Sequence, residues 1–380
     1  MTTSPPRLRE TTKAEPLGSF VAGQLTRLCR AVGLGHADAH GYADLLTQSL
    51  EHVVERPLDL PPHAPTFLSD DHTPVEFSLS FVPGADPTLR VLLEPGHGAG
   101  DLAANGRTGL RVVRAMAQRW GFTTDRLDEL EDLFFPPSPQ GPLALWLALE
   151  LRPGGVPKVK VYLNPAASGK DRAARTVREA LCRLGHERAF ATLPQADGYP
   201  FLALDLGDWE TPRAKIYLAH QGLSVADSGA LSRMDPGPEP HVLQEFLCTA
   251  GDLDASPAFR DSARFAGRPV LSCHSFTEAK SGLPSGFTLH FPVRDYASHD
   301  GEARARARAL LSRYGMDPAP LDRALAGVSG RRLQDGVGLI AYLALVHELG
   351  RPPRVTTYIS SEAYKVQPPR SQLSIPLPTR

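Results

Sequence analysis

Several segments of the chain alternate polar and apolar residues with a period of two, which is the pattern of a β-strand with two different faces. The clearest is RAKIYLAH at 213–220, where Arg213, Lys215 and Tyr217 share one face. The residues between them are apolar. Such a strand can pack its apolar side against a hydrophobic layer, so its polar side, with two cations and a phenol, requires an explanation.

Five pairs of strand-like segments occupy most of the chain, and each pair is joined by a short turn marked by Gly, Pro or Asp. The five predicted hairpins span residues 75–95, 142–165, 201–220, 272–293 and 338–361. Helical stretches precede them, and in 107–120 one face carries the apolar residues Leu110, Val113, Met116, Ala117 and Trp120. The pattern predicts an α+β fold in which an ααββ unit occurs five times, with about ten mostly antiparallel strands.

The second strand of each predicted hairpin repeats the polar face. In chain order these residues are Arg90, Lys160, Tyr162, Arg213, Lys215, Tyr217, Thr288, His290, Arg354 and Tyr358. A solvated face is the ordinary explanation of alternation, but five copies in one register argue against it. A dry core is excluded, because each unpaired buried charge costs several kcal/mol. We therefore expect the strands to close into a barrel with helices outside and a polar lumen inside.

Composition and length agree with such a barrel. The 380 residues are 42% hydrophobic and 22% charged, as in globular proteins, and the length exceeds the roughly 250–300 residues of a single solid core. We expect one barrel domain at 17–365 between flexible Pro-rich tails at 1–16 and 366–380. The formal net charge of −1 provides no field for nucleic acid. Neither a ~20-residue apolar run nor a signal peptide is present, which favours a cytoplasmic protein without membrane contact.

The predicted lumen suits a polyanion. Arg90, Lys160, Arg213 and Lys215 would together bind a diphosphate, because several charge-assisted hydrogen bonds compensate the desolvation of the cations. Tyrosine rings two residues further along the strands would stabilise a carbocation and exclude water. Glu76, on the polar face of the first predicted strand, is a candidate base or hydrogen-bond acceptor. These groups would ionise an allylic diphosphate and let an electron-rich acceptor capture the cation.

Motifs at these positions resemble a known family. TPVEFS at 73–78, KVYLNP at 160–165, RAKIY at 213–217 and RVTTY at 354–358 are similar to segments of the aromatic prenyltransferases of the dimethylallyltryptophan synthase type, whose fold is the ten-stranded ABBA barrel. FLSDDHTPVEFSLSF, FLALDLGDW and SSEAY most resemble the bacterial enzymes that prenylate tryptophan at C6. The resemblance covers about residues 17–365.

The resemblance implies roles for individual residues. Glu76 would accept a hydrogen bond from the indole N–H. The diphosphate of dimethylallyl diphosphate would be bound by Arg90, Lys160, Arg213, Lys215, Thr288, His290 and Arg354. The cation would be shielded by Tyr162, Tyr217 and Tyr358, and the tryptophan would contact Phe67, Leu68 and Trp146. Thr288 and His290 replace a Gln and a Tyr of the fungal members, and Trp146 replaces a lysine of the fungal C4-prenylating members.

No magnesium or other cofactor is expected. Metal-dependent isoprenoid synthases usually carry a D-D-x-x-D helix, and neither SDDH at 69–72 nor DELED at 128–132 fits it. We expect Asp70, Asp71 and the DELED segment to be solvated surface, and the lumen cations to replace the metal.

The sequence thus predicts metal-independent transfer of a dimethylallyl group to the indole of L-tryptophan, with C6 favoured. Another indole or a phenolic acceptor, or a non-catalytic barrel that binds an anionic ligand, stays open as an alternative. A third alternative is that the repeats form a solenoid-like surface whose Lys and Tyr residues bind an acidic protein or RNA. The ring position, the range of donors, the final proton acceptor and the oligomeric state are not determined by the sequence.

Overall fold

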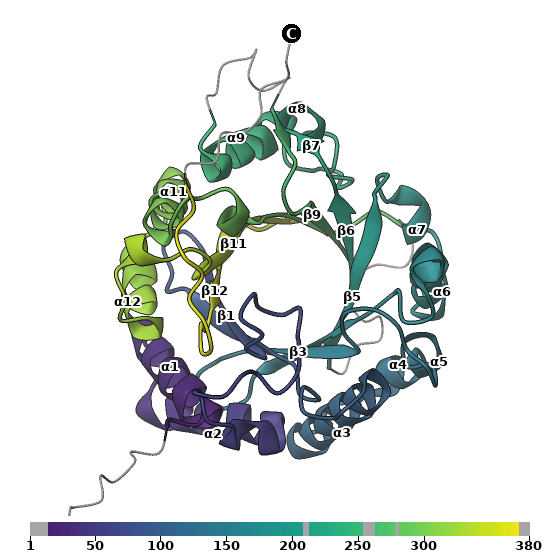
Figure 1. Ribbon diagram of the computed structural model, residues 1–380. Helices are drawn as coiled ribbons and strands as arrows, with labels where there is room; N and C mark the ends of the chain where they lie inside the picture. The colour runs from purple at the N-terminus through teal and green to yellow at the C-terminus, as the bar shows by residue number, and fades with distance from the viewer. Residues whose placement is uncertain (1–13, 208–212, 254–262, 278–280, 372–380) are drawn as a thin grey trace, which may run out of the picture.

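The computed structural model describes residues 14–207, 213–253, 263–277 and 281–371, and in it ten antiparallel strands close into a barrel (Figure 1). The strands are β1 (Val75–Phe81), β2 (Thr88–Leu93), β3 (Leu145–Glu150), β4 (Lys158–Leu163), β5 (Gly198–Leu206), β6 (Ala214–His220), β9 (Val270–Phe276), β10 (Gly286–Phe291), β11 (Ile340–Glu348) and β12 (Arg354–Ser360). The five predicted hairpins are all neighbouring pairs, and β12 pairs with β1 to close the barrel. The expected fold is confirmed.

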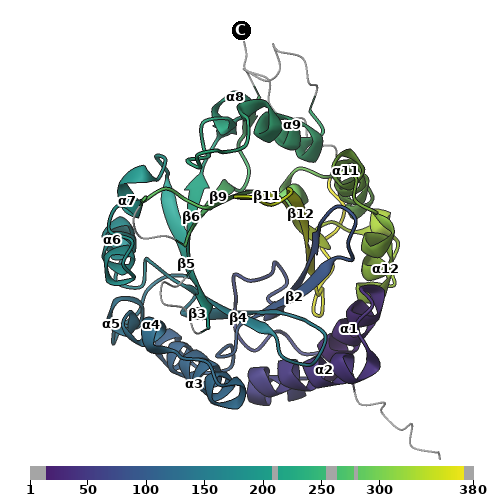
Figure 2. The ribbon, with the colours of Figure 1, turned by 180° about the vertical axis from the view of Figure 1, so that it is seen from behind.

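The helices form a ring around the barrel, as Figure 2 shows from behind. The longer ones are α1 (Leu17–Ala31), α2 (His36–Leu50), α3 (Leu102–Trp120), α6 (Ala173–Arg183), α9 (Pro240–Gly251), α11 (Asp300–Arg313) and α12 (Ala319–Val328). Short turns of helix are α4 (Asp125–Asp128), α5 (Glu131–Phe134), α7 (Ala189–Thr192) and α8 (Val225–Ser228). The second helix of the second and third ααββ units is therefore only one turn long in each case.

Alternation along each strand separates two environments. In β1 the residues Phe77, Leu79 and Phe81 turn outward and are almost fully buried against helices, and Ser78 and Ser80 turn into the lumen. The same division repeats around the barrel, so the hydrophobic core is a shell between strands and helices. The predicted polar lumen follows from this shell.

Helix α3 shows how local sequence sets an element. Asp101 precedes it, and the Asp101 carboxylate accepts a hydrogen bond from the Ala104 N–H at 2.7 Å, which starts the helix five residues before the predicted 107. Gly121 ends the helix with a φ of 68°, a conformation that glycine adopts without strain. Of the predicted apolar face, Trp120 is only partly buried.

A small sheet outside the barrel was not predicted. It pairs β7 (Leu223–Ser224) with β8 (Arg264–Phe265), each of two residues. Two residues are too few for a period-two pattern to be visible in a sequence.

The ends of the chain contact the barrel more than expected. Residues 1–13 and 372–380 of the predicted tails lie outside the described residues. Gln367 forms an isolated bridge with Val337, and the Arg370 guanidinium donates to the Arg294 carbonyl oxygen at 2.7 Å. The predicted tail from 366 is thus hydrogen-bonded to the barrel through residue 370, which its Pro-rich sequence did not indicate. In the described part of the chain, no helix is long and apolar enough to cross a bilayer.

Candidate active site

Two cavities meet inside the barrel. The larger cavity, about 660 Å³, is lined by the predicted cations Arg90, Lys160, Arg213, Lys215 and Arg354 and by Thr288. The smaller cavity, about 110 Å³, is lined by Phe67, Leu68 and Trp146 among others. Residues common to both walls form the junction of the cavities: Glu76, Leu92, Tyr162, Tyr217, His290 and Tyr358. Every predicted site residue therefore lies on one of these two walls.

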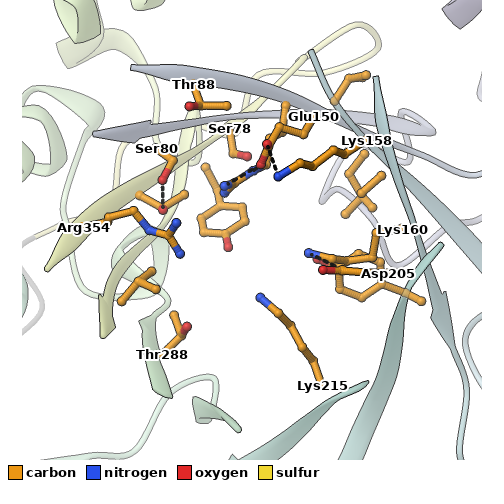
Figure 3. A pocket seen from close by; sticks show the side chains of 18 of the residues that line it. Ser78, Ser80, Thr88, Glu150, Lys158, Lys160, Asp205, Lys215, Thr288 and Arg354 are labelled. Carbon is orange, nitrogen blue, oxygen red and sulfur yellow. Dashed lines mark hydrogen bonds and ion pairs between the residues drawn. The ribbon is translucent and has the colours of Figure 1, made fainter. Parts of the chain in front are cut away.

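Carboxylates pair with most of the cations of the larger cavity. Figure 3 shows two of these pairs, Glu150 with Lys158 and Asp205 with Lys160. The Asp205 carboxylate forms ion pairs with the Lys160 ammonium at 3.3 Å and with the Arg213 guanidinium at 2.9 Å. The two cations hold the pKa of the Asp205 carboxyl below its usual value even though burial acts in the opposite direction. At this wall, three charged side chains therefore form one network.

Two further glutamates complete this pattern. Glu150 lies 3.0 Å from Arg90. Glu348 lies 2.7 Å from Arg354 and 3.3 Å from Arg213. Cation and carboxylate alternate around the wall, so each of these paired charges has a partner of opposite sign that offsets part of its desolvation cost.

Lys215 differs from the other cations. Among the described residues its ammonium has no carboxylate within ion-pair distance, and the side chain is 8% exposed. Burial, followed by the charges of Lys160 and Arg213, lowers the pKa of Lys215 to about 7. Figure 3 shows the head groups of Lys215 and Arg354 pointing into the cavity. An anion placed there would be the missing partner of Lys215.

The sequence analysis missed the three carboxylates, although a signal was present. Glu150 and Asp205 follow the same period-two alternation on the first strands of their hairpins, and Asp205 is the direct neighbour of Lys160 across β4 and β5. Arg152, Lys158 and Arg351 at the mouth of the larger cavity were likewise not assigned a role.

The junction is aromatic. The rings of Tyr162 and Tyr217 lie 5.7 Å apart and their hydroxyls 3.4 Å apart. His290 Nε2 is 3.2 Å from the Tyr358 hydroxyl. Burial raises the pKa of Tyr217 and Tyr358 and lowers that of His290 to about 3, so all three rings are neutral near pH 7. The aromatic residues of the junction thus present neutral π-systems.

Glu76 is the one acid of the junction. The side chain is 6% exposed and accepts no hydrogen bond from any described residue. Burial raises the pKa of Glu76 to about 7, Arg294 opposes this rise, and Asp70 adds to it. A carboxylate held without a donor between the two cavities can accept a hydrogen bond from a ligand N–H.

The smaller cavity is built from an aromatic wall and a loop. The rings of Trp146 and Phe201 lie 5.2 Å apart, and Leu68 packs on Trp146. Phe67 is 69% exposed at the rim. The cavity also includes Arg294, which comes from a 3₁₀ turn after β10, outside any periodic pattern, and was not predicted.

The loop that carries Phe67 and Leu68 is fixed by an aspartate. The Asp71 carboxylate accepts hydrogen bonds from the Thr73 hydroxyl at 2.6 Å and from the Tyr364 N–H at 3.0 Å, and Asp71 is 7% exposed. The expectation that Asp71 is solvated was therefore wrong, because a short polar loop over the barrel needs partners for its own backbone. Asp70 is ion-paired with Arg268 at 2.8 Å. In the DELED segment, Asp128 and Glu131 pair with Arg114 at the surface.

Comparison with known proteins identifies the family. The family model described as tryptophan dimethylallyltransferase matches residues 42–234. The structure of prenyltransferase PriB has 65% sequence identity and a TM-score of 0.92, with 94% of this chain and 99% of that chain covered. This chain belongs to the tryptophan dimethylallyltransferase family.

Two further structures of the family are similar. The 5-dimethylallyl tryptophan synthase from Streptomyces coelicolor, in complex with DMASPP and Trp, is 60% identical, with a TM-score of 0.89 and coverage of 95% of this chain and 99% of that chain. The 6-dimethylallyltryptophan synthase from Micromonospora olivasterospora is 39% identical, with a TM-score of 0.84 and coverage of 93% and 99%. As a member of the tryptophan dimethylallyltransferase family, this protein is a prenyltransferase with the ABBA barrel.

Within the described residues of this prenyltransferase, no group of three or more His, Cys, Asp or Glu side chains is arranged to hold a metal ion. The lumen acids Glu150, Asp205 and Glu348 are each occupied by Arg or Lys.

Proposed function

We propose that this protein transfers a dimethylallyl group from dimethylallyl diphosphate to the indole ring of L-tryptophan without a metal ion. The observation that carries the proposal is the meeting of a cationic cavity and an aromatic cavity at Glu76. A ternary structure of PriB, which contains L-tryptophan and dimethylallyl thiolodiphosphate, supports it. The catalytic unit is taken as a single domain at 17–365, because β1 and β12 must pair to close the barrel.

The larger cavity would bind the diphosphate. The diphosphate oxygens would accept hydrogen bonds from Lys215 and Arg354, whose head groups point inward. They would also accept hydrogen bonds from Arg90, Lys160 and Arg213. Thr288 and His290 would add neutral donors. As the C–O bond breaks, negative charge grows on the departing diphosphate, and fixed cations stabilise that charge more in the transition state than in the ground state. A structure of PriB with the product diphosphate supports this placement.

The dimethylallyl cation would form at the junction. Tyr162, Tyr217 and Tyr358 would surround it with π-faces that stabilise positive charge and exclude water. Indole in the smaller cavity would stack on Trp146 and attack the cation at short range. The wall of neutral rings favours alkylation of the indole over capture of the cation by water.

Glu76 would accept the hydrogen bond of the indole N–H. A carboxylate at this atom makes the ring more electron-rich as the arenium ion forms. The new C–C bond forms between the allyl carbon and a ring carbon, and the proton on that ring carbon is then lost to restore aromaticity. We assign the carboxylate of Glu76, through a relay, or a diphosphate oxygen as the acceptor of this proton.

The ring position is the finer part of the proposal. We propose C6, which follows from the sequence resemblance, and a relative 39% identical is named for that position. C5 is the second candidate, because a relative 60% identical is named for it. Trp146 forms the wall that would orient the indole in either case.

The experiment is direct. Purified protein is incubated with L-tryptophan and dimethylallyl diphosphate, and mass spectrometry follows the acceptor. A gain of one C5H8 unit is expected, and NMR of the product then assigns the ring position. Pyrophosphate release without a prenylated product would show that L-tryptophan is the wrong acceptor. If neither a prenylated product nor pyrophosphate were formed, the proposal would be overturned.

A further inference from the structure

Glu94 is a buried carboxylate that the proposed chemistry does not use. It follows β2 directly, is 3% exposed, and belongs to neither cavity wall. Helix α3 contacts it through Asn105, whose Nδ2 donates a hydrogen bond to Glu94 Oε1 at 2.6 Å. The other oxygen, Oε2, accepts a hydrogen bond from the Thr66 hydroxyl. These two donors replace part of the water that a carboxylate loses when it is buried.

Thr66 connects Glu94 to the acceptor loop, the segment that carries Phe67 and Leu68. The Thr66 hydroxyl donates a hydrogen bond to Glu94, and the same oxygen accepts one from the Leu68 N–H at 3.1 Å. Thr66 is 2% exposed, so bulk water does not compete for either bond. One oxygen atom therefore ties the backbone of Leu68, a residue of the smaller cavity, to the Glu94 carboxylate.

Glu94 also lies beside Trp146, which forms the aromatic wall of the same cavity. Burial raises the pKa of the Glu94 carboxyl, and interactions with Thr66, Asn105 and the Trp146 side chain oppose that rise. Trp146 Nε1 is buried and makes no hydrogen bond of good geometry to any described residue, so the Glu94 carboxylate is the acceptor that acts on this N–H. Leu68 packs directly on Trp146. The loop and the wall are thus joined both by contact and through Glu94.

The surroundings fix Glu94 itself. Gly96 brings the chain against helix α3, where a Cβ would lie 2.4 Å from the Asn105 carbonyl oxygen, so a larger residue does not fit. His97 is 3% exposed, and its Nδ1 lies 4.0 Å from Glu94 Oε2. Burial lowers the pKa of His97 to about 4, so its imidazole is neutral near pH 7. Glu94 is therefore held by hydrogen bonds rather than by an ion pair with this ring.

We propose that Glu94 is a positioning residue that holds the acceptor loop and Trp146 in one relative position and so selects the ring carbon that is alkylated. The inference rests on the proposed function, in which the indole occupies the smaller cavity. Neighbouring ring carbons are one bond length apart, so a shift of the loop or the wall by that distance would present a different carbon. Phe67 is exposed and cannot limit such shifts, whereas the buried hydrogen bonds of Glu94 can.

The test cuts the connection at Thr66. Thr66→Val is nearly isosteric and removes the hydroxyl that joins Glu94 to Leu68. We expect the KM for L-tryptophan to rise about 5- to 20-fold, the effect of losing one or two hydrogen bonds, and the KM for the donor to change less than about twofold. NMR of the product should show the share of a second ring isomer rising at least about threefold above wild type.

Two further variants control this result. Thr66→Ser restores the hydroxyl and should return the KM for L-tryptophan and the isomer ratio toward wild type. The matched control is Thr26→Val in helix α1, which removes a hydroxyl that donates to the Ala22 carbonyl oxygen at 2.9 Å. T26V should change neither quantity.

Glu94→Gln cuts the same connection at its other end. The amide keeps the size of the carboxylate but has one acceptor oxygen, so it cannot accept from both Thr66 and Asn105. Because E94Q and T66V break one chain of hydrogen bonds, their effects on the KM for L-tryptophan should not multiply in the double variant. Hydrogen exchange of the Leu68 amide should become at least about tenfold faster in each single variant, a readout that needs no turnover.

An unchanged isomer ratio and an unchanged KM for L-tryptophan in T66V would overturn the inference, even if kcat or stability fell, because they would show a purely structural role. Effects that multiply in the double variant would also contradict it. If T66V does not fold, E94Q gives the same isomer ratio and KM, with the same outcomes. Wild type that prenylates no tryptophan contradicts the proposed function instead, and exchange of the Leu68 amide still decides whether Glu94 holds the loop.

Discussion

The two ends of the lumen are built in different ways. The larger cavity is lined by a network of charged side chains on regular strands. Arg90 faces Glu150 and Lys160 faces Asp205 across neighbouring strands. The smaller cavity is assembled from a loop, a 3₁₀ turn and aromatic side chains, with Arg294 as its buried cation. The first has a repeating geometry suited to one diphosphate, and the second has a specific shape.

This difference indicates where specificity lies. A diphosphate is common to all prenyl donors, and a network of cations binds it without regard to the group attached. The acceptor must be oriented to within one ring carbon, which requires a wall of specific shape, and here the ring of Trp146 on β3 and the loop residue Phe67 contribute to that wall. Substitutions at the larger cavity should therefore change donor binding, and those at the smaller cavity should change the acceptor and the product.

The largest effect is expected at the junction. Glu76→Gln removes the carboxylate between the two cavities and should lower kcat about 100- to 1,000-fold, with the KM for the donor changed less than about threefold. Steady-state kinetics with each substrate varied measures both quantities. The control is E150Q, a lumen carboxylate paired with Arg90, which should act on the donor KM instead. Unaltered turnover in E76Q would remove Glu76 from the mechanism.

Lys215→Met should weaken diphosphate binding about 10- to 100-fold, because a charge-assisted hydrogen bond is lost. The same substitution should stabilise the protein without diphosphate by about 1–4 kcal/mol, since an apolar group replaces a buried unpaired cation. The pKa of Lys215 is lowered to about 7, so the gain should be largest below pH 7 and shrink as pH rises toward 10. Pyrophosphate titration and thermal unfolding at two pH values test this. Unchanged donor affinity would indicate a solvated side chain.

The dependence of kcat/KM on pH should reflect one titrating group on the acid side, Glu76, and another on the basic side, Lys215. Glu76 must be ionised, and its pKa of about 7 predicts that kcat/KM for the acceptor falls up to tenfold per unit as pH decreases below 7. Lys215 must be protonated, and its pKa of about 7 predicts that kcat/KM for the donor falls as pH increases above 7. The limb on the acid side should disappear in E76Q. A flat acid side in wild type would contradict the role of Glu76.

Asp205→Asn tests the network of ion pairs in the larger cavity. Without this carboxylate, Lys160 and Arg213 lose a shared partner, and the protein should be destabilised by about 2–4 kcal/mol. Pyrophosphate should restore more stability to the variant than to wild type, because it takes the place of the lost anion. Chemical unfolding with and without pyrophosphate gives both values. Equal stabilisation of variant and wild type would show that the cations do not face the diphosphate.

The smallest effect is expected at the rim. Phe67→Ala removes an exposed ring of the acceptor loop and should raise the KM for L-tryptophan about two- to fivefold, with no change for the donor. A change in donor KM alone would show that the loop does not belong to the acceptor side.

The same comparison explains what the sequence could predict. Period-two alternation placed Arg90, Lys160 and Lys215 in one lumen, because a strand leaves each side chain only two directions. Family resemblance added Phe67 and Leu68. Arg294 had no pattern, since its position depends on how the chain turns after β10 and how Tyr342 packs beneath it. Asp71 was expected at the surface because its role depends on Tyr364, almost 300 residues away.

In the proposed mechanism, side-chain cations take the part of a metal ion in diphosphate departure. The most direct measurement is the initial rate of C5H8 transfer to L-tryptophan by the same enzyme preparation in excess EDTA and in magnesium. We expect the rate in EDTA to be within about twofold of the rate in magnesium, and we expect K215M to reduce both rates equally. Loss of turnover in EDTA, with recovery on adding magnesium, would contradict this mechanism.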